Sequence, residues 1–256
     1  MPKVSLASVE KAPVVGSPAS TTGEVETRAL FARDIDPIHL FVHRMGPGAA
    51  MQFAGVPTDR LLYVWKGEIE AGGARLKPRS SAIVEYGTSL TTTAGKDGAT
   101  LLAFSLKERG AGERAGGHVH LLPSERVPQT ESVRGKRVGM ALHADSQCPT
   151  CKLWLHENDY FGPEETTLHS HSEDEVMFVR DGQIRLGNRL YGPGTALAIA
   201  AHTKYGFFSG PEGLSFVNFR GTAPTYRTAD GSMVLDEAEL WHSVVGKPEY
   251  LEPLAG

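Results

Sequence analysis

The segment Leu168 to Gly182, LHSHSEDEVMFVRDG, carries the pattern that decides the fold of this chain. His169 and His171 are two residues apart, and in an extended strand the side chains of residues i and i+2 point to the same face. Glu175 follows after three polar residues, so its carboxylate can join the two imidazoles. Two neutral imidazoles and one carboxylate on one face predict a site for a divalent metal ion (Fe, Mn, Ni or Zn), with open positions for water, dioxygen or substrate.

The composition favours an all-β protein. The 256 residues include 29 Gly and 16 Pro, with short apolar runs between them, which is typical of many strands joined by turns. The net charge of −4 and the pI near 6.2, without a Lys/Arg-rich run, argue against nucleic acid or an anionic membrane as a partner. No run approaches the ~20 apolar residues of a membrane helix, and the N-terminus lacks the apolar segment of a secretory signal. We therefore expect a cytoplasmic protein that binds a small molecule.

The second half of the chain repeats the first with a period of about 115 residues. YVWKGEIEAGG aligns with FVRDGQIRLGN, which places Gly67 opposite Gly182, and the segments SSAIV and GATLLAF align with TALAI and GLSFVNF. Two similar β domains are the economical interpretation. The predicted boundaries are an arm over residues 1–25, disordered or laid over a partner surface, a first barrel over 26–107, a connection over 108–136, a second barrel over 137–225, and a tail over 226–256.

The tail contains a helical pattern. VLDEAELWHSVVG (Val234 to Gly246) has apolar residues at helical spacing, and Asp236 stands where an N-cap is expected. The sequence therefore predicts one short terminal helix, which we expect to pack on the outside of a barrel.

The histidine segment resembles the first motif of the cupin superfamily. In that motif HxH is followed three or four residues later by Glu, and six residues after that by Gly, as in His169-Ser-His171, Glu175 and Gly182 here. A Gly-Pro-Gly turn (Gly192 to Gly194) and a GPEG turn (Gly210 to Gly213) follow where the second cupin motif lies. With the internal repeat, the chain resembles a bicupin. The resemblance implies two tandem jelly-roll (double-stranded β-helix) barrels, metal-dependent chemistry and a homodimer.

The second motif departs from the cupin pattern. When the GPEG turn and Gly206-Phe207 are held in register, the usual third histidine falls on Tyr205, and His202 lies three residues earlier. Phenol is a poor ligand at neutral pH, because its pKa is near 10. Two alternatives stay open: His202 ligates the metal, or Tyr205 contacts a metal-bound water or the substrate. Tyr205 and Glu175 are thus the candidate catalytic residues, with His169, His171, Glu175 and His202 as candidate metal ligands.

The first repeat has lost the ligand residue types. Ala54 and Val56 stand opposite the two histidines, and Arg60 stands opposite Glu175. The N-terminal barrel is therefore expected to hold no metal. Its expected role is to fold, to dimerise or to cover the other barrel.

Three further residues are assigned to the substrate pocket. Strand alternation from Glu175 turns Met177 inward, and Trp154 and His156 share one face of the strand before the histidine segment.

The pair Cys148-Pro-Thr-Cys151 allows three interpretations: a redox pair, half of a zinc site completed by His143 and His156, or two free thiols in a turn. His118-Val-His120, in the Gly-rich connection, is assigned to solvent.

The function hypotheses follow from these residues and from the resemblance. The first is a metal-dependent enzyme, dioxygenase-like or a decarboxylase, isomerase or lyase, that acts on a small oxygen-rich or aromatic metabolite in the second barrel. The alternative is a non-catalytic module that binds a metabolite or sugar acid around a structural or anchoring metal. A third possibility is redox sensing through Cys148 and Cys151.

Overall fold

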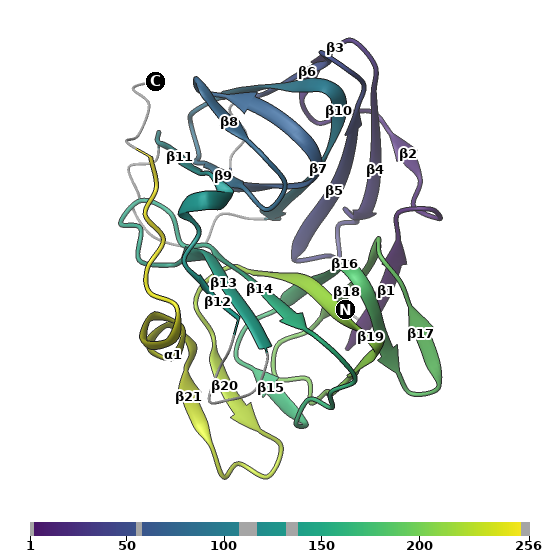
Figure 1. Cartoon of the computed structure of the whole chain (residues 1–256), viewed down its shortest axis with the longest axis vertical. Coiled ribbons are helices and arrows are strands. Elements are labelled where there is room, and N and C mark those ends of the chain that lie inside the picture. The colour runs from purple at the N-terminus through teal and green to yellow at the C-terminus, as the bar shows by residue number, and fades with distance from the viewer. Residues whose placement is uncertain (1–2, 55–57, 108–116, 132–137, 252–256) are drawn as a thin grey trace. The chain divides into compact units, whose positions relative to one another are not determined.

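A computed structural model of the chain describes residues 3–54, 58–107, 117–131 and 138–251 (Figure 1). All strand pairings given below are antiparallel, and the helical segments of these ranges are a 3-10 turn at Ser124–Arg126 and the helix α1 at Glu237–Val244. This confirms the predicted all-β class with one short helix near the C-terminus. No helix within the described ranges is long and apolar enough to cross a membrane.

The described residues form two compact units. The C-terminal unit contains those within Met1–Glu10, Pro128–Gln147 and Lys152–Pro248, and the N-terminal unit contains those within Lys11–Val127 and Cys148–Cys151 and from residue 249 on. Each unit has its own apolar core. Met51, Leu62 and Leu101 lie in the core of the N-terminal unit, and Val179 and Ile184 lie in that of the C-terminal unit.

The N-terminal unit is built on one sheet in the order β11-β9-β7-β10-β5-β4-β2, with β8 paired to β7 and the pair β3–β6 joined to β10. Its strands are β2 (Val14–Val15), β3 (Ser20–Thr22), β4 (Val25–Phe31), β5 (Ile38–Met45), β6 (Ala50–Phe53), β7 (Arg60–Ala71), β8 (Ala74–Leu76), β9 (Ser81–Val84), β10 (Leu90–Leu106) and β11 (Val119–Leu122).

The C-terminal unit has a sheet in the order β1-β18-β16-β19-β14-β13-β12, with β17 paired to β16, and a small second sheet in the order β15-β20-β21. Its strands are β1 (Val4–Ser8), β12 (Gln129–Thr130), β13 (Val138–Asp145), β14 (Trp154–Tyr160), β15 (His169–His171), β16 (Glu175–Leu186), β17 (Arg189–Tyr191), β18 (Thr195–Ile199), β19 (Phe208–Arg220), β20 (Thr225–Thr228) and β21 (Val234–Asp236).

The strand orders of the two main sheets can be aligned with each other, with β7 opposite β16 and β10 opposite β19. Gly67 of β7 lies opposite Ala99 of β10, and Gly182 of β16 lies opposite Leu214 of β19. Both glycines have a positive φ, 66° and 65° respectively, and both lie where the strand pairing shifts register. The alignment of Gly67 with Gly182 therefore marks one structural position in two copies, a bulge that only glycine enters without strain.

We predict that Gly182→Ala destabilises the C-terminal unit more than Gly187→Ala does. Both positions have a positive φ, which costs an alanine about 1 kcal/mol. A Cβ at Gly182 would also clash with the carbonyl oxygen of Gly213 and lie 3.0 Å from Cα of Leu214, whereas a Cβ at Gly187 meets nothing within 4 Å. Urea denaturation of the two variants measures the difference, and equal losses would contradict a close backbone approach at Gly182.

The N-terminal residues differ from the predicted arm. β1 pairs with β18 from Val4 opposite Ile199 to Ser8 opposite Thr195, and Figure 1 shows this purple strand beside the green strands of the C-terminal unit. β2 and β3 pair with β4 and β6. Val4 and Leu6 remain 41% and 47% exposed. The strand is thus held mainly by backbone hydrogen bonds, which leave little trace in a hydrophobic pattern.

The described part of the predicted connection, residues 117–131, also joins the sheets. β11 pairs with β9 in the N-terminal unit, at the edge position that β1 occupies in the C-terminal unit, and β12 pairs with β13. Each observed unit therefore extends beyond the predicted barrel at both ends.

The terminal helix begins where the sequence predicts it. Asp236 is its N-cap, and the carboxylate of Asp236 accepts from the amide of Glu239 at 3.2 Å. The sequence predicted that the helix packs on the outside of a barrel, but one face of α1 is buried in the C-terminal unit. Ala238 and Trp241 are buried against Met140, Leu142 and Trp154 of the C-terminal unit, so the helix forms part of that core.

Candidate functional site

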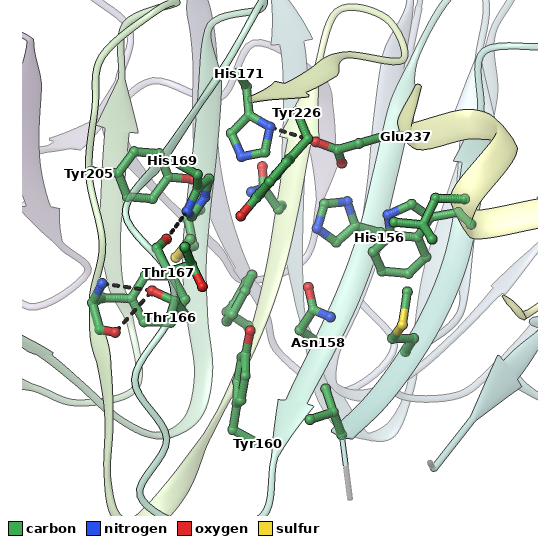
Figure 2. Close-up of a pocket in the computed structure, with 18 of the residues that line it drawn as sticks. His156, Asn158, Tyr160, Thr166, Thr167, His169, His171, Tyr205, Tyr226 and Glu237 are labelled. Atoms are coloured by element: carbon green, nitrogen blue, oxygen red, sulfur yellow. Dashed lines mark hydrogen bonds and ion pairs between the residues drawn. The ribbon is translucent and has the colours of Figure 1, made fainter. Parts of the chain in front are cut away.

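The C-terminal unit contains a partly open cavity of about 500 Å³. Alternate residues of two neighbouring strands line it: His156, Asn158 and Tyr160 on β14, which Figure 2 labels, and Phe216, Asn218 and Arg220 on β19. This follows from the two-residue period of a strand, which sends every second side chain to one face. The remaining lining residues are Val138, Met140, Glu164, Glu165, Thr166, Thr167, His169, His171, Met177, Tyr205, Phe207, Tyr226, Met233, Leu235, Glu237, Leu240 and Trp241.

The predicted histidines lie together on β15 and both line this cavity. Their ring centroids are 4.9 Å apart. Nδ1 of His169 donates to the carbonyl oxygen of Thr167 at 2.5 Å, and Nδ1 of His171 lies 2.5 Å from Oε1 of Glu237; Figure 2 shows both contacts. Each ring therefore keeps its Nε2 for another partner. Burial lowers the pKa of His169, which favours the neutral imidazole.

The carboxylate of Glu175 is occupied by hydrogen bonds from neighbouring side chains. Its Oε2 accepts from Nδ2 of Asn218 at 2.8 Å and from Nε and Nη2 of Arg220 at 3.0 and 2.6 Å. Burial opposes ionisation, yet the guanidinium charge of Arg220 lowers the pKa of Glu175 to about 2. Glu175 is therefore the carboxylate of a buried ion pair.

Arg220 joins Glu175 to Glu237. Its Nη1 donates to Oε2 of Glu237 at 3.1 Å, and its side chain is 1% exposed. Burial would raise the pKa of Glu237, but the charge of Arg220 keeps it below its usual value. One cation thus lies between two carboxylates at the edge of the cavity, and one of these carboxylates also contacts His171.

Tyr205 lines the cavity beside His169. Its backbone pairs with that of His169 in both directions, at 3.0 and 2.9 Å, and the two ring centroids are 4.6 Å apart. Burial, followed by the charge of Glu175, raises the pKa of the phenol well above its usual value. Tyr205 is therefore a neutral phenol at the cavity wall.

His202 is not brought to this cavity. It has a left-handed backbone with φ of 61°, its amide donates to the carbonyl of His171 at 2.8 Å, and its side chain is exposed. The residues that line the cavity do not include it.

The predicted pocket residues take different places. Met177 and His156 line the cavity, whereas Trp154 lies behind it, fully buried. Nε1 of Trp154 donates to Nδ1 of His156 at 2.7 Å, and the other face of His156 packs on Trp241 with ring centroids 4.4 Å apart. Burial lowers the pKa of His156 well below its usual value, so the ring is a neutral, fixed part of the wall.

The helix α1 contributes residues that the sequence analysis did not assign. Glu237, Leu240 and Trp241 line the cavity, although the helix was expected outside the barrel. Arg220 and Asn218 were also missed. Their signal in the sequence was two polar residues, two apart, in the apolar run LSFVNFRG.

In the N-terminal unit, Arg60 stands at the strand position that Glu175 has in the C-terminal unit. Arg60 begins β7 opposite Val84 of β9, as Glu175 begins β16 opposite Ile199 of β18. The guanidinium of Arg60 donates to the carbonyl of Ala54 at 3.0 Å and lies 5.6 Å from the ring centroid of Phe53. Val56, the residue aligned with His171, lies outside the described residues.

The fold is an all-β jelly roll of the cupin type, and comparison with solved structures supports this. The chain is similar to YlbA from E. coli, with a TM-score of 0.63 and 12% identity over 85% of this chain and 90% of that one. It is also similar to the oxalate decarboxylase of Lactobacillus farciminis in its formate complex, with a TM-score of 0.66 and 10% identity over 88% of each chain. A third similar structure is a proposed dioxygenase from Nostoc punctiforme, with a TM-score of 0.64 and 12% identity over 92% of this chain and 87% of that one.

No protein-family model matches the chain, and no curated protein matches it in sequence. Because the identities to the solved structures are this low, the likeness concerns the fold, and the chemistry has to be argued from the site.

Proposed function

We propose that this protein is a bicupin enzyme whose C-terminal cavity converts a small oxygen-rich or aromatic molecule, with a divalent metal ion held by His169 and His171. The observation that carries this is the orientation of the two rings. Each Nδ1 contacts an oxygen, from Thr167 in one case and from Glu237 in the other. In metal-binding histidines an acceptor at one ring nitrogen fixes the tautomer and turns the other nitrogen toward the ion. The contact of His169 is such a hydrogen bond, whereas that of His171 is a close approach to a carboxylate without hydrogen-bond geometry.

Glu175, the predicted third ligand, does not fit. Its carboxylate accepts hydrogen bonds from Arg220 and Asn218, and an ion bound to it would lie beside the guanidinium charge of Arg220. The three predicted ligands also do not form a group whose ligand atoms all lie within 4.8 Å of one another. The fit is therefore limited to the two histidines, and substrate or water would supply the other ligands.

The cavity suits a small molecule with one polar end. Its volume is within the range of about 300–1,000 Å³ that small-molecule sites have. Tyr160, Phe207 and Phe216 form an apolar aromatic group in contact with one another on one side, and the histidines lie on another. A bound divalent ion would polarise an oxygen of the substrate and stabilise the negative charge that develops there.

The residues around the histidines hold the two imidazole rings in place and do not change protonation state near neutral pH. Tyr205 is a weak acid because its pKa is raised, which favours a role in holding Glu175 and His169 over a role as proton donor. Tyr226 stacks on His169 with ring centroids 4.9 Å apart and planes 19° apart. Glu237 is the carboxylate beside Nδ1 of His171, and Arg220 balances its charge.

The alternative function is a non-catalytic module that binds a metabolite or sugar acid. The hydrogen bonds of Glu175 favour this alternative, because they leave only His169 and His171 as protein ligands. Two protein ligands hold an ion weakly and leave its other coordination positions to an oxygen-rich ligand. Turnover separates the two functions, because the alternative predicts thermal stabilisation by a ligand without its consumption.

We predict that the double variant His169→Ala/His171→Ala loses the metal ion of the C-terminal unit and all activity. Elemental analysis after growth with added iron, manganese and nickel measures the ion, and oxygen uptake with catechols, flavonols and diketones, together with a decarboxylation assay on small keto and dicarboxylic acids, measures turnover. His202→Ala is the matched control: it removes an exposed imidazole that does not line the cavity, so metal and activity should be unchanged. Full metal content in a correctly folded double variant would contradict the proposal.

A further inference from the structure

A second cluster of metal-ligand side chains lies outside the cavity described above. Its members are Glu85, His120, Cys148 and Cys151, and the ligand atoms of all four lie within 4.8 Å of one another. All four belong to the N-terminal unit, because the loop residues Cys148–Cys151 group with it. Two sulfurs, an imidazole and a carboxylate gathered at one point are the donor types of a zinc site.

Two paired strands place the imidazole and the carboxylate. His120 lies on β11 opposite Ile83 of β9, and Glu85 follows directly after the last residue of β9. The amide of Glu85 donates to the carbonyl of His118 at 3.1 Å, which extends the pairing of the two strands beyond β9. Both side chains therefore project from a hydrogen-bonded sheet, and such a support holds ligand atoms more precisely than a loop does.

Cys148 completes the geometry. Its Sγ lies 3.4 Å from Oε1 of Glu85 and 3.7 Å from Nε2 of His120. With Zn–S of about 2.3 Å and Zn–N or Zn–O of about 2.0–2.2 Å, two tetrahedral ligands of these types are about 3.5 Å apart. Both separations match. Nε2 of His120 and Oε1 of Glu85 are hydrogen-bonded at 2.7 Å, a distance that would lengthen by about 0.6 Å if both bound one ion.

Neighbouring groups orient the ligands. The backbone amide and Nδ1 of His118 contact Oε2 of Glu85 at 3.2 and 3.1 Å, which turns Oε1 toward His120 and Cys148. The amide of Cys151 donates to Sγ of Cys148 at 3.3 Å, and a donor at this distance favours the thiolate. Outer partners of this kind are typical of protein metal sites.

Two members of the cluster are buried, and His120 and Cys148 are partly exposed. The side chains of Glu85 and His120 are 0% and 13% exposed, and Cys151 is 1% exposed. Four protein ligands without an open position are typical of a structural zinc site, whereas a catalytic one keeps a place for water.

From this geometry we infer that Glu85, His120, Cys148 and Cys151 bind one zinc ion in a closed, four-coordinate site that fastens the loop Cys148–Cys151 to β9 and β11. A redox disulfide would use only the two sulfurs and would leave the convergence of His120 and Glu85 on Cys148 without a role. The site is independent of the cavity in the C-terminal unit and of the function proposed for it.

The ligands differ from those considered in the sequence analysis. His143 is paired with Glu157 at 2.9 Å, both fully buried, and His156 is hydrogen-bonded to Trp154. Both histidines belong to the C-terminal unit and are not members of the cluster. His120, which was assigned to solvent together with His118, is the member that the sequence interpretation missed.

Elemental analysis of the full-length protein, purified without chelators, tests the inference. The expected result is one zinc per chain that Cys148→Ser and Cys151→Ser each abolish and that His169→Ala/His171→Ala leaves in place. The last variant separates this site from the one in the C-terminal unit. His118→Ala, which removes only an outer partner of Glu85, should weaken zinc binding about 10–100-fold.

Because a cysteine variant can lose zinc through misfolding, cobalt(II) exchanged into the unmodified protein provides the second measurement. The inference predicts intense d–d absorption of a tetrahedral ion together with sulfur-to-cobalt charge transfer. A weak octahedral spectrum without charge transfer overturns it, as does zinc retained in Cys148→Ser. A Cys148–Cys151 disulfide in protein that takes up no zinc after reduction also overturns it.

Discussion

Replacing Arg220 by methionine is expected to lower the free energy of unfolding by about 3–5 kcal/mol, the cost of removing one partner from a buried ion pair. The side chain of Arg220 is 1% exposed and is paired with Glu175 at 2.6 Å and Glu237 at 3.1 Å. Methionine approximates its length but leaves both carboxylates buried without a counter-charge. The pKa values of both should then rise. Urea denaturation measures the loss of stability.

Arg44→Met is the matched control for this variant. Arg44 is paired with Glu26 at 3.2 Å, and the two side chains are 49% and 37% exposed. Exposed ion pairs contribute little to stability, so this variant should be nearly neutral. If Arg220→Met lowered the free energy of unfolding as little as Arg44→Met does, water would have to reach Glu175 and Glu237. The result would contradict a buried ion pair between Arg220 and Glu175.

Acidification is expected to remove about 3 kcal/mol of stability through Glu175 alone, the equivalent of a pKa that falls from 4.5 when unfolded to about 2 when folded. A carboxyl whose folded pKa is depressed stabilises the protein above its unfolded pKa. That stability is lost as the pH falls from about 5 to about 2, because the unfolded chain binds the proton first. Urea denaturation over this range measures the slope.

Glu175→Gln is the variant that isolates this contribution. It should be less stable than the natural protein near neutral pH and should show a flatter loss between about pH 5 and 2. A second group acts at higher pH: burial lowers the pKa of His43 to about 4, so its effect falls between that value and about 6.5, the unfolded value. An unchanged slope below pH 4 in Glu175→Gln would contradict the assignment of the low pKa to Glu175.

The internal repeat was accessible from the sequence because it depends on local backbone requirements. Gly67 and Gly182 are both bulge residues with a positive φ, and a bulge of this kind requires glycine wherever it occurs. The turns and apolar runs around them recur at one spacing. The position of His169, His171 and Tyr205 side by side was likewise predictable, since it follows from strand alternation and from the motif order.

The charge environment of Glu175 was not accessible in this way. Its spacing after the histidines predicts a ligand, but Arg220, 45 residues later in the chain, is its strand neighbour on β19. Glu237 arrives from the terminal helix, after a further 17 residues. Whether a carboxylate meets an ion or a guanidinium depends on which strands become neighbours, and a one-residue change of register would send Arg220 to the other face.

The sequence by itself determined the all-β class, the capped terminal helix and the histidine pair, because each depends on a local pattern of strand or helix periodicity, turn residues or residue spacing. Only the tertiary structure decided that β1 closes the edge of the C-terminal unit, that Glu175 pairs with Arg220, and that Cys148 and Cys151 meet Glu85 and His120. The physical reason is the same in all three. Each joins segments far apart in the chain through backbone hydrogen bonds or polar contacts, and neither leaves a periodic signal in the sequence.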